Sequence, residues 1–554
     1  MSFWRPSVIK ELLETMNRKS TSAAGIWASL LLAFLLSFFA PVQAFLTNLN
    51  DFSFDFYDMA GYLAVLLILS FCFLFLITLL CRAKQKIESL WLVFLCTSIL
   101  AFYLQGTFFA SWLPTMDGSS FDWRSHAEQR WISLLLWAVP FCLSFALCKT
   151  LKAERFRTLI SFASKAGLLF LLITMTLSIA TTKNAMQKKT GVRVSSDHIL
   201  TMSDDTNFII VLLDCIDSHA FTDIILSTPS DREVLNDFTF YRNTVGSYNL
   251  TSHAVPYLLT GKWYENQEPY SDYLTRETGS SSLFQVLKEH NYRMGLYDDT
   301  VSVTSFALDN FDNIYPADSF SAPFKFCKMM IKLVGFRYLP FDCKPYCLLS
   351  PEDIYFDTLK GSPEESVFSW DNREFYQILQ RESIEHIQEK NFRFIHLQGG
   401  HGGWQYNEFL EPVGQSNYEY GIKGSVFALK NYFQMLKEAG VYDNSVIFVL
   451  ADHGANLVNE VYRSNPILLI KGFHEVHPLA VSDAPLSHED IMEAYFLALD
   501  GCQSDELFSW QEGDERTRRY LIVNDNEDLV EMMQSGYAMD EETFSGTGVV
   551  YPHP

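Results

Sequence analysis

Five long apolar segments follow one another in the first third of this 554-residue chain. Each is long enough, or nearly so, to cross a hydrocarbon core of about 30 Å as a helix, and few charges interrupt them. Five such segments in a row predict a transmembrane domain over residues 1–182 rather than a set of buried core helices. The predicted spans are residues 23–46, 60–80, 90–113, 131–148 and 159–181.

Charges in the short loops predict the orientation of these helices. Lys and Arg concentrate on the cytoplasmic side of membrane proteins, so a cytoplasmic N-terminus places everything after Thr182 outside. The basic residues are Arg5, Lys10, Arg18, Lys19, Arg82, Lys84, Lys86, Lys149, Lys152, Arg155 and Arg157, and Asp51, Asp55 and Asp58 mark the opposite side. As an alternative, the first segment fits a signal peptide with Val42-Gln43-Ala44 as its cleavage site, but cleavage would break the match between five crossings and the loop charges.

The rest of the chain is strongly acidic. Residues 1–195 carry 18 Lys and Arg against 10 Asp and Glu, and the remainder carries 24 against 55. Such a domain repels the phosphate backbone, which argues against nucleic acid as a partner. Three cysteines of this part, Cys327, Cys343 and Cys347, fit either a disulfide in an oxidising compartment or a zinc knuckle that lacks a fourth ligand.

After a polar connector, apolar strands alternate with amphipathic helices. The segments 207–213 and 446–451 read as strands buried on both faces, and further strands are predicted near 292–297, 392–398 and 466–471. This alternation predicts an α/β domain with a mostly parallel sheet between helices. The predicted division is a connector at 183–206, a catalytic domain at 207–500 with an irregular insertion near 300–370, and a C-terminal acidic extension at 501–554.

Polar side chains follow the predicted strands directly. Asp214 comes after the first strand, and Asp452 and His453 come after the strand 446–451. The carboxyl ends of parallel strands meet at one edge of the sheet, and carboxylate plus imidazole ligands suit zinc or manganese. His401, on a glycine-flanked turn, is a candidate for binding a phosphoryl oxygen or a metal, whereas His396 lies inside its strand and is predicted to be structural.

The nucleophile is predicted in the segment Tyr241–Gly261, at Thr251, with a short helix following from about His253. Side-chain oxygens at a helix N-terminus meet unpaired N–H groups and the positive end of the dipole, which suits phosphate or sulfate esters. A threonine hydroxyl needs a metal to become a useful nucleophile. As an alternative, Thr251 or Ser252 is only the N-cap of the helix.

In these motifs the chain resembles the sulfatase branch of the alkaline phosphatase superfamily. More narrowly, it resembles lipoteichoic acid synthases and phosphoethanolamine transferases, which combine five N-terminal helices with an extracytoplasmic catalytic domain. The motifs are VLLD ending at Asp214, the segment Thr251–Gly261, and ADHG at 451–454. Soluble sulfatases carry C-x-P-S-R before L-L-T-G, and LLTG at 258–261 puts Thr251 in the place of the cysteine. Pro256 follows Thr251 at the spacing of the phosphoethanolamine transferases.

The resemblance implies that one divalent metal, zinc or alternatively manganese, is ligated by Asp214, Thr251, Asp452 and His453. It also implies that His401 binds substrate. The sequence departs from the sulfatases because no cysteine is available to become formylglycine, and from lipoteichoic acid synthases because they typically have Glu in the place of Asp214.

The function expected from this resemblance is the transfer of a phosphoethanolamine or phosphoglycerol head group from a phospholipid to a cell-envelope glycan or lipid glycan. Thr251 would form the covalent intermediate, and the enzyme would be a multi-pass protein of the bacterial inner membrane with its catalytic domain outside. The alternatives are a sulfatase-type hydrolase of sulfate or phosphate esters and a catalytically silent membrane protein of this type.

Overall fold

The computed structural model divides the chain into two compact units, residues 1–191 with 318–363, and residues 192–317 with 364–554. The first is called the helix unit below, and the second the sheet unit. The residues that the structure describes are 23–49, 52, 54–109, 112–113, 123, 126–186, 192–298, 304–316, 323–349, 368–455, 457, 459–524 and 526–553. The predicted basic residues Arg5, Lys10, Arg18 and Lys19, and also Asp51, lie outside these ranges.

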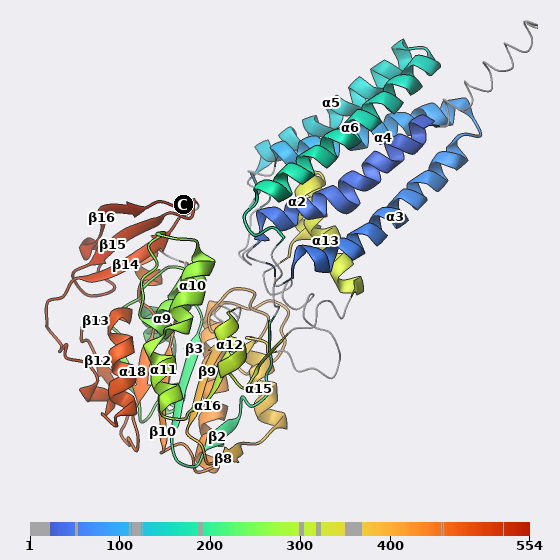
Figure 1. Ribbon diagram of the computed structural model, residues 1–554. Coiled ribbons are helices and arrows are strands. Elements are labelled where there is room, and N and C mark those ends of the chain that lie inside the picture. Colours follow the sequence, from blue (N-terminus) through green and yellow to red (C-terminus); the bar gives the residue numbers. More distant parts are fainter. Residues whose placement is uncertain are drawn as a thin grey trace, which may run out of the picture. The chain divides into compact units, whose positions relative to one another are not determined.

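Within the described residues, five helices are long and apolar enough to cross a membrane (Figure 1). This confirms the predicted five-helix N-terminal region, although the third helix ends at Phe108 rather than at residue 113. Asp55 and Asp58, which were predicted to mark one side of the membrane, form a capping box at the start of the second helix. The first helix is Ala23–Thr47; it contains a π-helical stretch (Leu35–Phe39), and its last part is α2 (Ala40–Thr47). The other four are α3 (Phe56–Cys81), α4 (Gln85–Phe108), α5 (Ala127–Thr150) and α6 (Ala153–Thr181).

The signal-peptide alternative concerns residues that lie inside this first helix. Val42, Gln43 and Ala44 belong to α2, and Val42 and Ala44 are buried there. Val42 packs in one apolar cluster with Phe45 and with the start of α3. In this structure the segment is therefore part of the helix packing.

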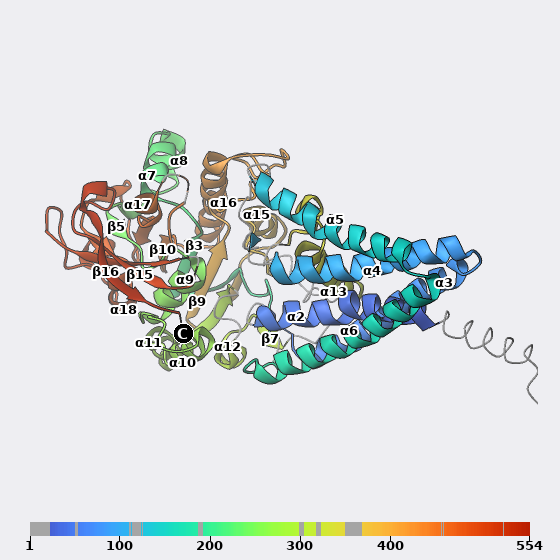
Figure 2. The ribbon, with the colours of Figure 1, turned by 90° about the horizontal axis from the view of Figure 1, so that it is seen from above.

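The predicted insertion joins the helix unit and not the sheet unit. It contains α13 (Pro323–Tyr338) and the 3₁₀ helix Phe341–Cys347, and α13 contacts α2, α3 and α4 (Figure 2). Phe326, Met329 and Leu333 of α13 are buried in a cluster with residues of α2, of the start of α3 and of the end of α6. The segment that interrupts the sheet unit, residues 318–363, lies within the range predicted as an insertion, near 300–370. All three cysteines of this segment, Cys327, Cys343 and Cys347, are free thiols, so the expected disulfide is not formed.

A seven-stranded sheet forms the centre of the sheet unit, in the order β12-β4-β11-β10-β3-β9-β6. β11 runs antiparallel to both its neighbours, and the other adjacent pairs are parallel, which confirms a mostly parallel sheet. The strands are β3 (Asn207–Leu213), β4 (Thr239–Tyr241), β6 (Arg293–Tyr297), β9 (Asn391–Leu397), β10 (Ser445–Leu450), β11 (Leu468–Lys471) and β12 (Ala480–Ser482).

Helices cover both faces of this sheet, as the unbroken apolar strands require. Phe208, Ile210 and Leu212 of β3 pack into one core cluster, and the intervening residues Ile209 and Val211 pack into a second one on the other face. The first cluster includes residues of α9 (Thr251–Thr260), α11 (Ser282–Glu289) and α18 (Ile491–Leu499). The second includes residues of α15 (Asn372–Arg381) and α16 (Tyr418–Glu438).

Shorter elements connect or flank this core. The short strands are β1 (Val192–Val194), which pairs with β7 (Ile314–Pro316), β2 (Thr201–Ser203), which pairs with β8 (Glu385–Ile387), and β5 (Thr244–Val245), which pairs with β13 (Leu486–Ser487). The short helices are α7 (Ser218–Phe221), α8 (Pro229–Glu233), α10 (Tyr270–Gly279), α12 (Ser305–Asn310) and α17 (Glu460–Arg463).

The C-terminal segment forms a second sheet rather than a separate extension. β14 (Arg518–Val523), β15 (Leu529–Gln534) and β16 (Phe544–Tyr551) make an antiparallel meander. β14 lies beside the loop that precedes α9, because Leu521 N–H donates to Ser247 O at 2.8 Å and Asn249 N–H donates to Leu521 O at 3.3 Å. The predicted division at residue 501 therefore does not match the structure, since these strands belong to the sheet unit.

Candidate active site

Two adjacent parallel strands bring the predicted carboxylates to one edge of the sheet. Ser445 to Leu450 of β10 pair in parallel with Asn207 to Leu212 of β3, so both strands end at the same level. Asp214 and Asp452 follow these ends and are 2% and 0% exposed. The backbone N–H of Cys215 donates to Asp452 Oδ1 at 3.2 Å, which joins the two strand ends directly.

The imidazole of His453 is held between a backbone carbonyl and a carboxylate. Its Nδ1 atom lies 2.9 Å from Gly454 O, and its Nε2 atom lies 3.2 Å from Asp452 Oδ2. When Nδ1 carries the proton and donates it to the carbonyl, Nε2 presents its lone pair to the site. This is the form of histidine that binds a metal.

Thr251 is the first residue of α9, and its hydroxyl faces the same histidine. Its Oγ1 atom lies 3.3 Å from His453 Nε2, and the side chain is half-buried. The N-cap is Leu250, without a side-chain hydrogen bond. The alternative that Thr251 or Ser252 is only an N-cap is therefore wrong, and the helix begins two residues before the predicted start at His253.

A buried histidine connects Asp214 to a third strand end. His396 lies on β9 with its Nε2 atom 3.5 Å from Asp214 Oδ2 and its Nδ1 atom 2.7 Å from Asp298 Oδ1. Burial acts to lower the pKa of His396, but the two carboxylates raise it well above its ordinary value. In turn, burial acts to raise the pKa of Asp214, while His396, His401 and His453 bring it below its ordinary value. His396, which was predicted to be structural, thus contacts one of the predicted site carboxylates.

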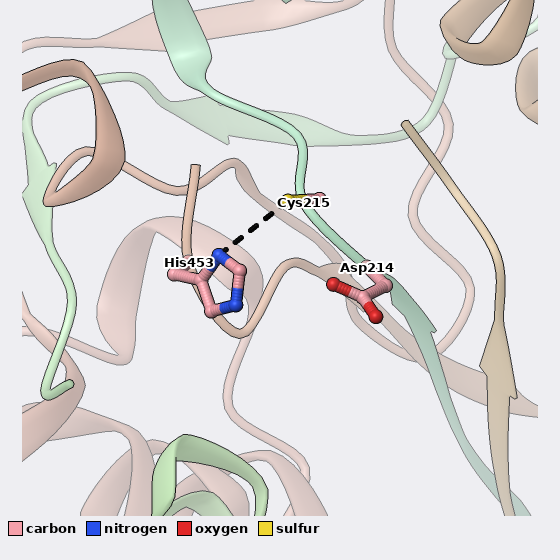
Figure 3. A group of neighbouring side chains, drawn as sticks. All are labelled: Asp214, Cys215 and His453. Atoms are coloured by element: carbon pink, nitrogen blue, oxygen red, sulfur yellow. Dashed lines mark hydrogen bonds between the residues drawn. The ribbon is translucent and has the colours of Figure 1, made fainter. Parts of the chain in front are cut away.

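Cys215 adds a thiol to this group. Its backbone has φ of 63°, and its Sγ atom lies 3.6 Å from His453 Nδ1 and 3.8 Å from Gly454 O. Figure 3 shows that the thiol faces the Nδ1 edge of the ring, while Asp214 lies toward the other ring nitrogen. Burial, together with Asp214 and Asp452, raises the pKa of Cys215 well above its ordinary value, so the thiol is protonated at neutral pH.

His401 lies in the turn after β9, near but not within this cluster. Its ring makes an edge contact with Trp370 at a centroid distance of 5.0 Å, and its side chain is partly exposed. His401 is one of the three histidines that lower the pKa of Asp214. A partly exposed imidazole in this position is free to meet a substrate oxygen.

The donor set fits a divalent cation. In the described part of the chain, the carboxylate oxygens Asp214 Oδ1 and Asp452 Oδ2 are buried atoms that make no hydrogen bond. Ligand atoms of Asp214, Cys215 and His453 all lie within 4.8 Å of one another. Unpaired carboxylate oxygens in a buried site are costly unless a cation neutralises them. Carboxylate oxygens with an imidazole nitrogen suit zinc and manganese.

Four residues of the site surroundings were not predicted as site residues: Cys215, Asp298, His396 and His488. Asp298 follows β6, so the strand-end rule that found Asp214 also points to it. His488 is 3% exposed, and its Nδ1 atom accepts a hydrogen bond from Ser247 N–H at 3.2 Å. No sequence pattern distinguished His488 or Cys215 from ordinary buried residues.

Comparisons with solved structures give relatives of low identity. A protein of the alkaline phosphatase superfamily from Vibrio parahaemolyticus is 12% identical, covers 66% of this chain and 84% of its own, and has a TM-score of 0.34. A phosphonate monoester hydrolase from Silicibacter pomeroyi is 11% identical, with coverages of 63% and 89% and a TM-score of 0.33. The C-terminal periplasmic domain of phosphoethanolamine transferase EptC from Campylobacter jejuni is 13% identical, with coverages of 55% and 94% and a TM-score of 0.29.

Sequence comparisons are more decisive. No curated protein matches the chain. The sequence model of the sulfatase family, however, matches residues 199–476, half of the chain. That range begins before β3, ends after β11, and contains Asp214, Thr251, Asp452 and His453. This chain therefore belongs to the sulfatase family.

Proposed function

We propose that this chain is a membrane-bound, metal-dependent phosphotransferase. It moves a phosphoethanolamine or phosphoglycerol head group from a phospholipid to a hydroxyl of a cell-envelope glycan or lipid glycan. The observation that carries the proposal is the position of the Thr251 hydroxyl. Thr251 is the first residue of α9, and its Oγ1 atom lies 3.3 Å from His453 Nε2. A hydroxyl there, next to a histidine that also contacts Asp452, suits attack on a phosphorus centre.

Asp214, Asp452, His453 and Thr251 would hold the metal, which supplies charge neutralisation and a lowered hydroxyl pKa. The chain's own residues orient this set. Cys215 N–H fixes Asp452 through its Oδ1 atom, and Gly454 O fixes the ring of His453. His396 contacts Asp214 Oδ2 through its Nε2 atom, and both side chains are buried.

The reaction has two displacements on phosphorus. In the first, Thr251 Oγ1 forms a bond to phosphorus, and the bond from phosphorus to the diacylglycerol oxygen breaks. The threonine proton is lost to water, and the departing oxygen takes up a proton. In the second, an acceptor hydroxyl loses its proton and attacks the phosphorus, the bond from phosphorus to Thr251 Oγ1 breaks, and this oxygen takes up a proton. His401, partly exposed, binds a non-bridging phosphoryl oxygen in both steps.

Phosphoryl transfer is favoured over sulfate-ester hydrolysis because of the residue at position 251. A threonine cannot become the formylglycine that sulfatases derive from cysteine at this position. The five apolar helices favour a donor that resides in the bilayer, since such a donor is already concentrated near the enzyme. The proposed location is the inner membrane of a bacterium, with the sheet unit on the outer side.

Intact mass spectrometry of the full chain in lipid nanodiscs tests this proposal. After loading with zinc and incubation with phosphatidylethanolamine or phosphatidylglycerol, the wild-type chain should gain the mass of one head group. Thr251→Ala should gain nothing. Ser252→Ala is the matched control, because Ser252 is an exposed hydroxyl one residue away and should behave as the wild type.

Other outcomes contradict the proposal in different ways. Release of free head group by the wild type, without an adduct and without an acceptor product, would indicate a hydrolase. Metal binding without adduct or release would indicate a catalytically silent protein. An adduct that persists in Thr251→Ala would assign the nucleophile to another residue.

A further inference from the structure

The 3₁₀ helix Phe341–Cys347 and α13, which belong to residues 318–363, are anchored inside the helix unit by specific contacts. Tyr338, at the end of α13, lies so close to Gly106 of α4 that a Cβ atom at Gly106 would overlap its ring. The guanidinium of Arg337 donates to Gly106 O at 3.1 Å. Phe341 N–H donates to Ser133 Oγ of α5 at 3.0 Å in a buried position. α13 is therefore a built part of the helix unit.

An apolar groove of about 380 Å³ runs between α13 and the first two spanning helices. Its walls are residues 32–41 of the first helix, residues 66–74 of α3, Phe102 of α4 and residues 330–339 of α13. The polar side chains in the walls are Ser37, Ser70 and Tyr338, and Ser37 Oγ donates to Ser70 Oγ at 2.8 Å. Because the two serines satisfy each other, the groove suits a hydrocarbon ligand and not a polar one.

The groove opens to the side of the helix unit. Phe73 and Ile331 belong to its wall and are 64% and 63% exposed. Phe73 lies on α3, one of the five candidate spanning helices, and an exposed apolar side chain on a helix that spans a membrane faces lipid. From Leu32 to Pro41 the wall rises about 14 Å, at 1.5 Å per residue. That is close to half of a hydrocarbon core of about 30 Å, which is the depth of one leaflet.

A row of basic side chains lies on α13 beside the groove. Lys325, Lys328 and Lys332 are spaced i, i+3 and i+7, so they share one face of the helix. Lys328 is exposed, and Lys332 Nζ donates to Leu348 O at 3.3 Å. In the part of the chain that the structure describes, none of the three forms an ion pair with a carboxylate. Basic groups at the edge of an apolar groove complement the phosphate of a lipid.

We propose that this groove holds an acyl chain of a phospholipid whose phosphate lies against the basic face of α13. The inference rests on the proposed function, because it assigns the groove to the phospholipid donor of that reaction. In this proposal α13 completes the lipid site on the membrane-spanning helices. The occupant is a diacyl phospholipid, since the walls provide hydrocarbon contacts and the rim provides cations.

Photochemical crosslinking tests the groove without requiring catalysis. The full chain is placed in nanodiscs that contain phosphatidylethanolamine with a diazirine on one acyl chain, then irradiated, digested and analysed by mass spectrometry. Adducts should concentrate on residues 330–339 and 66–74, relative to Leu134 and Leu135, which are exposed on α5 and lie outside the groove. Equal labelling of both regions would overturn the inference.

Filling variants sharpen the test. Ser70→Phe should reduce adducts on residues 330–339 about tenfold, because the added ring takes the volume of the ligand. Leu69→Phe is the matched control, since Leu69 is 61% exposed and is not part of the groove wall. Ile331→Trp, which blocks the groove from its rim, should act as Ser70→Phe does. Unchanged adducts in both filling variants, each with a wild-type thermal unfolding midpoint, would overturn the inference.

A transfer assay on the same samples separates the two proposals. If adducts concentrate on the groove residues but the wild-type chain transfers no head group, the result would support the lipid groove and contradict the proposed phosphotransferase activity. Transfer that Ser70→Phe retains at the wild-type rate from long-chain phosphatidylethanolamine would contradict the assignment of the groove to the donor. Lys328→Gln should weaken labelling and transfer together.

Discussion

The Nδ1 atom of His396 lies 2.7 Å from the Oδ1 atom of Asp298, and both side chains are buried. The other ring nitrogen of His396 faces Asp214, so the pair fixes the orientation of a carboxylate at the centre of the site. Such outer contacts determine how well the ligands of a metal are positioned.

Asp298→Asn should weaken metal binding about 10- to 100-fold, the usual effect of removing a partner behind a ligand. The reason is that His396 then loses the anion that orients it toward Asp214. The affinity is measured by competition with a chelating dye. Asp204→Asn is the control, because His386 and Asp204 form a pair at the same 2.7 Å but are exposed. Equal affinities of wild type and Asp298→Asn would contradict the positioning role.

Gly399→Ala should destabilise the sheet unit by about 2–4 kcal/mol, from backbone strain plus overpacking. Gly399 has φ of 59°, and a Cβ atom there would lie 2.2 Å from Asp214 O. Gly402→Ala in the same turn should be nearly neutral, since nothing lies within 4 Å of its Cβ position. Thermal unfolding of both variants checks this difference, and equal midpoints would refute it.

Asn249→Ala should lower head-group transfer and cost about 1–3 kcal/mol of stability, because it leaves buried backbone groups unpaired. Asn249 Oδ1 accepts from Val523 N–H at 2.8 Å, and its Nδ2 donates to Val523 O at 3.2 Å. These bonds tie β14 to the loop that ends at Thr251. Asn526→Ala, an exposed change near the same strand, is the control for urea unfolding and transfer assays.

The stability of the sheet unit should fall as the pH drops from about 6.5 toward 4. Burial lowers the pKa of His488 to about 4, and its Nδ1 atom is already occupied by Ser247 N–H. Below about 6.5 the unfolded chain takes up a proton that the folded chain does not, so unfolding is favoured by up to about 3 kcal/mol. His488→Gln should flatten the fall of the unfolding midpoint with pH. His290→Gln, at an exposed histidine, should leave it unchanged.

Local patterns were sufficient to predict the centre of the site. β3 and β10 are apolar after their first residues, Asn207 and Ser445, which requires cover on both faces, and their register then places Asp214 and Asp452 together. The position of Thr251 beside His453 needed the resemblance to a known family. Nothing in the local sequence relates a helix N-terminus to a strand end that lies two hundred residues later.

The parts that sequence analysis missed depend on tertiary packing. The apolar residues of α13 show that a helix has a buried side, but not that this side faces membrane helices rather than the sheet. The acidic C-terminal segment has strands with mixed burial, and only their pairing with the loop at Ser247 shows that they belong to the sheet unit. His396 sits on an otherwise apolar strand, so its contact with Asp214 depends on which strand lies next to β3.

The path of the chain has a consequence for biosynthesis and for protein production. The polypeptide passes between the two units at residues 191/192, 317/318 and 363/364. β3 and α13 leave the ribosome before β9 and β10, the strands that flank β3, so α13 is available to the helices while the sheet is still incomplete. A fragment that starts at residue 192 would expose Phe326, Met329 and Leu333 without their covering helices. A soluble form of the sheet unit would instead require residue 317 to be joined to residue 364.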